Sequence, residues 1–290
     1  MKLGFIGLGK MGANMVENLL DHGHSVVVYD LSREAVERIA AKGASAALSL
    51  DDMADRIALP RRIFWLMVPS GSPVDTTLDA LLPLLQAGDI VIDGGNSNYK
   101  DTLRRNARLS EGDVHFMDVG TSGGLEGARN GACMMIGGDP DVYKELVPLF
   151  RDLCVLDGYG YMGKSGAGHF AKMVHNGIEY GMMQAIGEGF DILENSGFAF
   201  DHREVAKVWA NGSVIRGWLM DLVTDAFGRS GKLEYLSGEI ADSGEGKWTI
   251  ETALDQGVSI PVIANALFRR YRSRSRDNFS DKVVAALRHE

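Results

Sequence analysis

The chain has 290 residues, 45% of them hydrophobic and 24% charged, which is enough for one large domain or two ordinary ones with a proper core. Its 30 Lys and Arg against 39 Asp and Glu give a net charge of −9, which argues against a general nucleic-acid binder or anionic-membrane binder. We find no signal peptide and no apolar run of the ~18 residues that a membrane span needs, so we expect a cytoplasmic protein. Cys133 and Cys154 lack the spacing of a zinc site or disulfide framework, and we expect both to be buried and reduced.

The first half of the chain alternates short apolar runs with amphipathic segments. We expect strands at residues 3–6, 25–29, 63–68, 90–92, 114–119, 133–136 and 153–156. Helical patterns lie between most of these runs, for example at 10–20, 33–41 and 74–85. This alternation predicts an α/β fold with a Rossmann-type, doubly wound and mostly parallel sheet, connected by right-handed crossovers.

A glycine-rich turn follows the first expected strand and opens the first expected helix: Gly7, Leu8, Gly9, Lys10, Met11 and Gly12. In this context the Gly-x-Gly-x-x-Gly spacing predicts a dinucleotide site. The first glycine permits the tight turn, the second lets the backbone approach the pyrophosphate, and the third lets helix and strand pack closely.

The second expected strand ends in Tyr29 and Asp30. A carboxylate at this place accepts a hydrogen bond from the ribose 2′-hydroxyl and repels a 2′-phosphate, so the predicted cofactor is NAD and not NADP. Arg33 could soften that preference by turning toward a phosphate, although a solvated residue in the first turn of the next helix is the more typical interpretation.

The pattern changes across a glycine-rich stretch between Gly158 and Gly168, beyond which helical periodicity dominates. The sequence therefore predicts an NAD-binding domain at residues 1–160 and an all-helical domain for substrate binding and oligomerisation at 161–290. Four glycines interrupt the long helical region after it: Gly177, Gly181, Gly187 and Gly189. Each lowers helix stability by roughly 1 kcal/mol, which indicates close approach by another helix or a ligand.

Five polar residues recur at helical spacing within this region: Lys172, His175, Asn176, Glu179 and Tyr180. Positions i, i+3, i+4, i+7 and i+8 lie on one face of a helix, with Met173, Val174 and Ile178 turned away from it. A solvated polar face would account for any one pair of these residues. A base, an acid and three hydrogen-bonding groups together favour a catalytic helix.

This helix and three loops resemble the 6-phosphogluconate dehydrogenase family over essentially the whole chain. The loops are Asp93-Gly94-Gly95-Asn96-Ser97, the run from Gly120 to Arg129, and Gly246-Lys247-Trp248-Thr249. The wider β-hydroxyacid dehydrogenase superfamily shares the nucleotide motif, the Ser-Gly-Gly loop and the pair Lys172 and Asn176, whereas His175, Glu179 and Tyr180 narrow the resemblance to this family. The chain is similar to the short form, which is often NAD-linked, because the second helical repeat of longer members is missing.

The resemblance implies oxidative decarboxylation of 6-phosphogluconate to ribulose 5-phosphate without a metal. Neutral Lys172 would take the 3-hydroxyl proton as hydride leaves C3 for the nicotinamide, and its cation would then stabilise the enolate oxygen. Glu179 would protonate C1 of the enediol, and His175 and Asn176 complete the catalytic set. The residues that would hold the sugar acid are Asn96, Ser122, Gly123, Gly124, His175 and Asn176. The residues that match cofactor-contacting loops are Val68, Pro69, Ser70 and Asn96.

Tyr180 and Arg270 match phosphate-binding positions of the family. Ser243 and Glu245 stand where longer members carry a Lys and a Thr that contact phosphate. Because a carboxylate repels a phosphate dianion, we expect Glu245 to point away, or the pocket to be built differently. Of the arginines at 269, 270, 272, 274 and 276, all but Arg270 are interpreted as a solvated helix end.

In this family a neighbouring subunit's tail completes the substrate site. A glycine-rich helical domain with Met and Trp residues would expose apolar surface by itself, so we expect a homodimer or a homotetramer.

Two alternatives stay open. The chain could be another β-hydroxyacid dehydrogenase that does not decarboxylate, such as a 3-hydroxyisobutyrate dehydrogenase or a tartronate semialdehyde reductase; Ser243 and Glu245 favour this interpretation. It could also be a catalytically silent NAD-binding or redox-sensing module, but that hypothesis predicts loss of the polar helix residues, and all of them are present.

Overall fold

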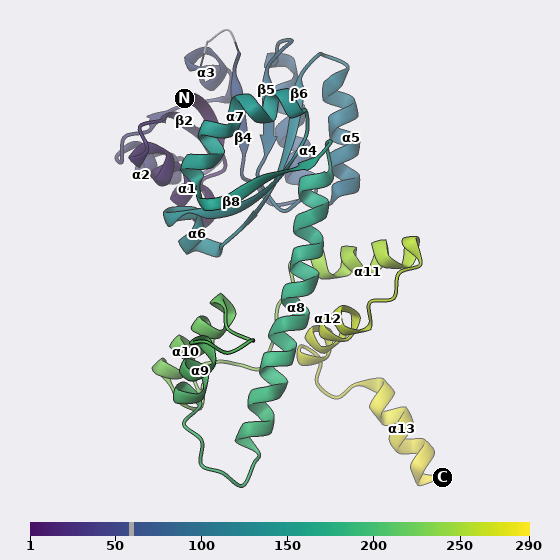
Figure 1. The fold of residues 1–290 in the computed structure, drawn as a ribbon. Coiled ribbons are helices and arrows are strands. Elements are labelled where there is room, and N and C mark those ends of the chain that lie inside the picture. Colours follow the sequence, from purple (N-terminus) through teal and green to yellow (C-terminus); the bar gives the residue numbers. More distant parts are fainter. Residues whose placement is uncertain (58–60) are drawn as a thin grey trace. The chain divides into compact units, whose positions relative to one another are not determined.

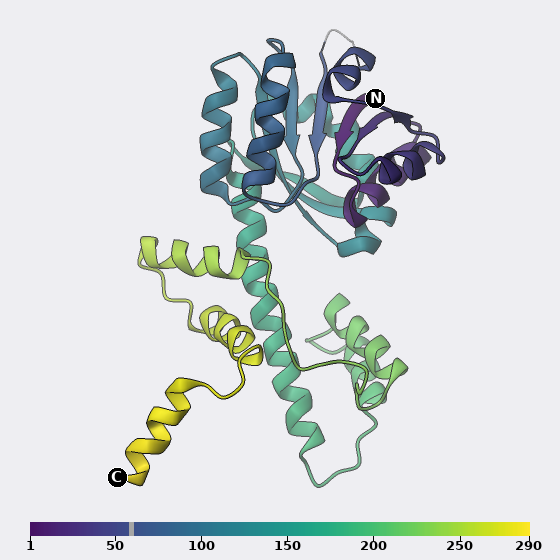
Figure 2. The same ribbon diagram turned by 180° about the vertical axis from the view of Figure 1, so that it is seen from behind.

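The computed structural model describes residues 1–57 and 61–290, and the chain divides into two compact units, Met1–Val174 and His175–Glu290 (Figures 1 and 2). Helix α8 (Ala167–Glu194) begins in the first unit and ends in the second. The border expected at residue 160 lies before this division, because the end of the last strand and the first turns of α8 pack with the sheet.

Among the described residues, the first unit is built on one eight-stranded sheet in the order β3-β2-β1-β4-β5-β6-β7-β8. Neighbouring strands are parallel except for β6 and β7, so the predicted doubly wound, mostly parallel sheet is confirmed. The strands are β1 (Lys2–Ile6), β2 (Ser25–Tyr29), β3 (Ser45–Ala46), β4 (Ile63–Leu66), β5 (Ile90–Asp93), β6 (His115–Ser122), β7 (Ala132–Gly137) and β8 (Cys154–Gly163). The order reverses between β1 and β4, which makes this the topological switch point where such sheets bind ligands.

Helices cover both faces of this sheet (Figure 1). They are α1 (Lys10–Asp21), α2 (Arg33–Ala40), α3 (Leu50–Arg56), α4 (Ser72–Leu81) with a 3₁₀ turn at Leu82–Leu84, α5 (Tyr99–Ser110), α6 (Gly124–Asn130) and α7 (Pro140–Leu153). Alternate strand residues enter separate cores: Phe5 and Trp65 pack with α1 and α7, whereas Phe64 and Leu66 pack with α3 and α4. Burial on both faces explains why the strands appear as continuous apolar runs in the sequence.

Strand β8 corrects the sequence analysis at its last expected strand. The glycine-rich stretch that was predicted to separate the domains continues β8 as far as Gly163. A Cβ at Gly158 would lie 2.9 Å from the carbonyl oxygen of Ala132 in β7, so glycine is needed there for the two strands to approach. The expectation that strand structure ends at residue 156 was therefore wrong, because glycines hide the alternation of side chains.

The two cysteines lie in different environments. Cys133 is exposed and Cys154 is half-buried, and both are free thiols. Burial raises the pKa of the Cys154 thiol to about 12, which keeps that sulfur protonated and unreactive near neutral pH. The prediction that both thiols are buried was wrong for Cys133, which lies opposite Ser122 in the antiparallel pair of β6 and β7.

The second unit, residues 175–290, consists of helices joined by turns and loops and has no strand. Beside the rest of α8 it contains α9 (His202–Ala210), α10 (Trp218–Arg229), α11 (Glu245–Gln256), α12 (Pro261–Ser273) and α13 (Phe279–His289). Two small cores form along α8, one around Tyr180 and Leu267 and one around Phe190 and Met220. Helix α13 has no buried residue.

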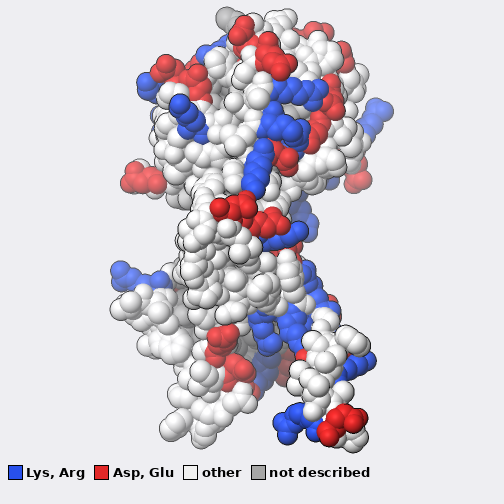
Figure 3. Space-filling model, turned by 90° about the vertical axis from the view of Figure 1, so that its right-hand side faces the viewer, with Lys and Arg blue, Asp and Glu red and all other residues white. Residues whose placement is uncertain are grey.

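Acidic and basic side chains are interspersed on the face drawn in Figure 3. No helix in the described part of the chain combines the length and the apolar character that crossing a membrane requires.

Candidate active site

The glycine-rich turn lies at the switch point, between β1 and α1. Gly7 has a φ of +98°, and a Cβ there would lie 2.4 Å from the carbonyl oxygen of Met67. A Cβ on Gly12 would lie 2.0 Å from the Gly7 carbonyl oxygen, so α1 contacts the turn backbone directly. Gly9 precedes α1 with no heavy atom within 4 Å of its Cβ position, and this open backbone beside a helix N-terminus suits a pyrophosphate.

Asp30 lies directly beside this turn, after β2. Its Oδ2 accepts the N–H of Leu8 at 2.6 Å and its Oδ1 accepts the N–H of Ser32 at 2.7 Å. The Arg33 side chain is 86% exposed and pairs with Glu37 at 3.1 Å. The structure therefore supports a solvated role for Arg33 and leaves Asp30 as the charged group beside the turn.

Replacing Asp30 with alanine is expected to lower the NAD-to-NADP ratio of kcat/KM by about tenfold, because one charge-assisted hydrogen bond and one repulsive charge are removed. Affinity for both dinucleotides should also fall, since the N–H of Leu8 loses its acceptor. Arg33→Ala is the matched control and should leave the ratio unchanged. An unaltered ratio in Asp30→Ala would refute the cofactor argument.

Two further loops leave the same edge of the sheet, after β4 and β5. The first carries Val68, Pro69 and Ser70, of which Pro69 and Ser70 are exposed. The second carries Asn96, whose Oδ1 is buried without a hydrogen-bond partner. A buried amide oxygen without a donor indicates a position that a bound molecule completes.

The Ser-Gly-Gly loop joins β6 to α6. Ser122 ends β6, and Gly123 and Gly124 follow with φ of +115° and +59°. Both angles lie in the left-handed region that glycine adopts readily, and successive residues of this kind direct backbone N–H groups toward one side. The loop can therefore receive a carboxylate without obstruction by side chains.

Lys172 is placed by close packing of α8 on β6, and its side chain is only 5% exposed. A Cβ built on Gly120 would lie 2.3 Å from the Cβ of Lys172, and one built on Gly168 would lie 2.5 Å from the carbonyl oxygen of Asp118. Residues 118, 120 and 122 share one face of β6, and 168 and 172 share one face of α8. Lys172 therefore lies against Gly120, which precedes Ser122 by two residues in β6.

Asp118 anchors the start of this helix, and sequence reasoning missed it. The carboxylate is fully buried and accepts the N–H of Gly166 at 2.7 Å and that of His169 at 2.9 Å. It therefore satisfies two N–H groups that a helix N-terminus leaves without internal partners, and its charge complements the helix dipole. An acid two residues before Gly120 is the only local signal, and it does not identify the partner.

The rest of the polar face lies on α8 in the second unit. Asn176 is buried, and its Oδ1 lies 3.0 Å from Nδ1 of His175. The same ring nitrogen lies 3.9 Å from Oε2 of Glu179, and both of these side chains are half-buried. His175, Asn176 and Glu179 thus form one connected polar group.

The expected phosphate pocket in the second unit contains a carboxylate. Arg270 stacks 3.6 Å above the Tyr180 ring and donates to the Ala241 carbonyl oxygen at 2.5 Å. The Tyr180 hydroxyl accepts the N–H of Ser243 at 3.3 Å, and the Ser243 hydroxyl donates to Glu245. Glu245 is only 1% exposed, and its carboxylate accepts the Ser243 hydroxyl within the Tyr180 cluster.

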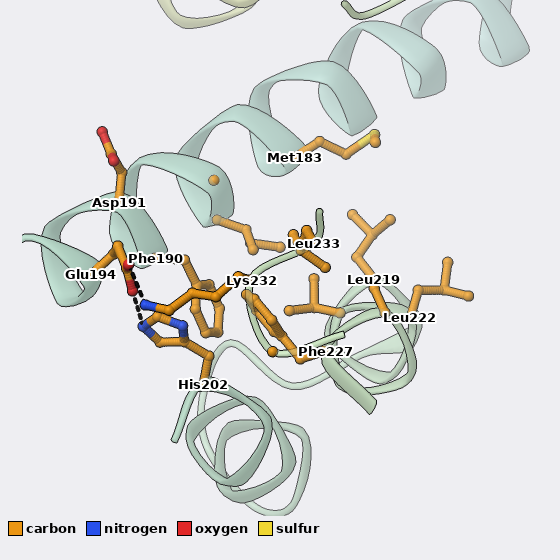
Figure 4. A pocket seen from close by; sticks show the side chains of 15 residues that line it. Met183, Phe190, Asp191, Glu194, His202, Leu219, Leu222, Phe227, Lys232 and Leu233 are labelled. Atoms are coloured by element: carbon orange, nitrogen blue, oxygen red, sulfur yellow. Dashed lines mark hydrogen bonds and ion pairs between the residues drawn. The ribbon is translucent and has the colours of Figure 1, made fainter. Parts of the chain in front are cut away.

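A cavity of about 500 Å³ lies between α8, α9 and α10, and no predicted site residue lines it. Its wall is mostly apolar, including Phe190 and Phe227. Figure 4 shows the polar end, where Glu194 contacts Lys232 and lies 3.5 Å from Nε2 of His202. Such a wall offers few partners to the hydroxyl groups of a sugar acid, so it does not suit the substrate.

Hydride transfer from an alcohol needs a dinucleotide beside a base. The first unit offers an open glycine-rich turn at the switch point for the dinucleotide. It also holds the buried Lys172 beside the Ser-Gly-Gly loop. No group of three or more His, Cys, Asp and Glu in the described residues is arranged to hold a metal ion. The fold and these features together are typical of a dinucleotide-dependent dehydrogenase.

Comparison with known proteins narrows this class. The model of the NAD-binding domain of 6-phosphogluconate dehydrogenase matches residues 2–163, and the model of the C-terminal domain of that enzyme matches residues 168–286. A Bacillus subtilis protein provisionally named a 6-phosphogluconate dehydrogenase is 53% identical over 100% of this chain and 97% of its own length. The chain belongs to the 6-phosphogluconate dehydrogenase family.

Two other relatives are matched over different shares of their own length. A Haloferax volcanii protein named as an NAD(+)-dependent, decarboxylating 6-phosphogluconate dehydrogenase is 46% identical over 100% of this chain and 96% of its own. The solved structure of Plasmodium falciparum 6-phosphogluconate dehydrogenase, described with NADP+ and with 6-phosphogluconate, is 27% identical with a TM-score of 0.86. The match covers 99% of this chain and 64% of the Plasmodium falciparum chain.

Proposed function

We propose that this chain oxidises and decarboxylates 6-phospho-D-gluconate to D-ribulose 5-phosphate and carbon dioxide with reduction of NAD. The observation that carries the proposal is Lys172, buried against β6 beside the Ser-Gly-Gly loop, in a chain that matches both domains of this family. Asp30 supports NAD as the cofactor over NADP.

The bound nicotinamide supplies the acceptor for the hydride that leaves C3. Lys172 enters as a neutral amine and takes the proton of the 3-hydroxyl, which produces a 3-keto acid. The keto group accepts the electrons of the breaking carbon–carboxyl bond as carbon dioxide leaves. Protonated Lys172 then stabilises the developing enolate oxygen, which makes a metal ion unnecessary at that step.

Glu179 gives a proton to C1 of the resulting enediol and must be a carboxylic acid at that moment. It follows Lys172 by two helical turns on α8, so the two groups act on successive steps from one face. His175 lies 3.9 Å from the Glu179 carboxylate, as a neighbouring group one turn away on the same helix. Ser122, Gly123, Gly124, Asn96, His175 and Asn176 hold the sugar acid.

The substrate phosphate is held by Arg270 and Tyr180 in a pocket that differs from that of longer family members. The buried Glu245 beside Tyr180 accepts the Ser243 hydroxyl through one carboxylate oxygen, and that bond must persist when the phosphate is bound. Glu245 is also the observation that favours a second candidate, a β-hydroxyacid dehydrogenase for an unphosphorylated substrate such as 3-hydroxyisobutyrate.

The partner in solution is a second copy of the chain, in a homodimer or a homotetramer. The helical unit supports this proposal because it exposes many large apolar side chains: Ile178, Met182, Ile192, Phe198, Val214, Leu254, Val262, Phe279 and Leu287. Association with a second copy would remove such apolar side chains from water.

One assay separates the candidates. NAD reduction should be strong with 6-phosphogluconate and weak with gluconate or 3-hydroxyisobutyrate, and trapped carbon dioxide should equal the NADH formed. NADH formation from 6-phosphogluconate without carbon dioxide would contradict the mechanism. Preference for 3-hydroxyisobutyrate would favour the second candidate, and no turnover with any of the three would favour a silent NAD-binding module.

A further inference from the structure

Arg105 is a buried charge that the proposed mechanism does not use. It lies in α5 and is 1% exposed. Its guanidinium donates to both carboxylate oxygens of Asp75, at 2.9 and 3.2 Å, and to the carbonyl oxygen of Gly71 at 3.0 Å. It also donates to the Ser97 hydroxyl at 3.3 Å and lies 3.6 Å from Oδ2 of Asp93.

These acceptors belong to the two loops that leave β4 and β5. Gly71 ends the first loop, and Asp75 follows it in the first turn of α4. The second loop is wound around Asp93, which is fully buried and accepts the Gly95 N–H at 3.1 Å and the Ser97 hydroxyl at 2.6 Å. Arg105 therefore bonds to both loops at once.

The joined loops are those that carry Val68, Pro69, Ser70 and Asn96. Asp30, at the end of β2, marks the side of the switch point that receives the ribose of the adenosine half. The loops after β4 and β5 lie on the other side, where the nicotinamide half must extend. The unpartnered Oδ1 of Asn96 lies in the second of them.

We propose that Arg105 is a positioning residue that holds these two loops in the spacing required by the nicotinamide half of the dinucleotide. The proposal rests on the proposed function only for the identity of the bound dinucleotide. One planar guanidinium, with five N–H donors on three nitrogens, satisfies acceptors on both loops at once, whereas an ammonium group has three donors on a single nitrogen.

The ion pair stays intact over the working range of a dehydrogenase. Hydrogen bonding from Arg105, with a smaller contribution from Arg104, lowers the pKa of Asp75 to about 2. A lowered carboxyl pKa means that the pair is lost only as the pH falls through that value. The carboxylates that pair with Arg104 and Arg105 are those of Asp75, Asp93 and Asp101. The bonds of Arg105 to the two loops should therefore not change near neutral pH.

The test uses Arg105→Lys and the matched control Arg104→Lys on the same helix. Arg104 also bonds Asp75, but its side chain is 54% exposed and it reaches neither loop carbonyl nor Ser97. Dissociation constants are measured by titration for NAD and for ADP-ribose, which lacks the nicotinamide. We expect Arg105→Lys to weaken NAD binding by about tenfold and ADP-ribose binding by less than about twofold, with Arg104→Lys like the parent for both.

A merely structural role for Arg105 predicts equal weakening of both ligands, and that result would overturn the proposal, as would unchanged NAD binding. If Arg105→Lys does not fold, Ser97→Ala decides, because it removes only the hydroxyl between Arg105 and Asp93. If Ser97→Ala weakens NAD binding more than ADP-ribose binding, the positioning role of Arg105 is supported. Unchanged NAD affinity rejects it. Neither ligand needs a substrate, so the result is independent of the reaction assay.

Discussion

Replacing Lys172 with methionine is expected to abolish turnover, with a loss of roughly 10⁴-fold in kcat, while the dissociation constant of NAD stays unchanged. Methionine has nearly the same length and no charge, so it fills the buried position against Gly120 without disturbing α8. It removes both the acceptor of the 3-hydroxyl proton and the cation that stabilises the enolate. The measurement is kcat with 6-phosphogluconate beside NAD titration.

The control for this variant is Lys164→Met, which changes an exposed lysine in the same unit. It should retain parental turnover, because Lys164 lies outside the polar face of α8. Near-normal activity in Lys172→Met would remove the assignment of the base. Loss of NAD binding in that variant would instead assign Lys172 to the cofactor site.

Gly120→Ala is expected to lower kcat by roughly 100-fold, because the new methyl group would lie 2.3 Å from the Lys172 Cβ. The Cβ cannot rotate away as the end of a flexible side chain can, so α8 must shift from β6. Overpacking of this kind also lowers the free energy of unfolding by about 1–3 kcal/mol. Thermal unfolding, NAD titration and kcat measured together separate misplacement of the lysine from general instability.

Gly160→Ala is the matched control for this glycine. It lies in β8 of the same sheet, where a Cβ would meet only the terminal methyl of Met162, at 3.1 Å. A flexible methyl can move, so stability and kcat should change little. Parental kcat in Gly120→Ala would show that the contact with β6 does not set the position of Lys172.

The first half of the fold could be predicted because its signals are local. Apolar runs, a Gly-x-Gly-x-x-Gly turn and an acid after the second strand each occupy a few consecutive residues, and the structure places Asp30 within hydrogen-bond distance of that turn. Two short elements were not anticipated, β3 at Ser45–Ala46 and α3 at Leu50–Arg56. The signal for α3 was present, since Ser49 caps the helix by accepting the N–H of Asp52.

Errors arose where the environment of a side chain depends on distant residues. Cys133 lies on β7 but is exposed, and the environment of Glu245, which the sequence left open, is set by Ser243 and Tyr180. No pattern in the neighbouring sequence predicts the exposure of Cys133 or the burial of Glu245. The mostly apolar cavity beside Phe190 was also not anticipated, because three separate helices build its wall.

The sequence by itself determined the class of fold, the dinucleotide turn and the polar face that carries Lys172, since helical and strand periodicity and glycine spacing act over short stretches of chain. Only the tertiary structure decided what holds these groups in place. Asp118 meets the start of α8 across 48 residues, and Arg105 meets Asp75 across 30. A buried charge needs a partner, and that partner can lie far away in the sequence. Only the folded structure therefore shows which residues pair.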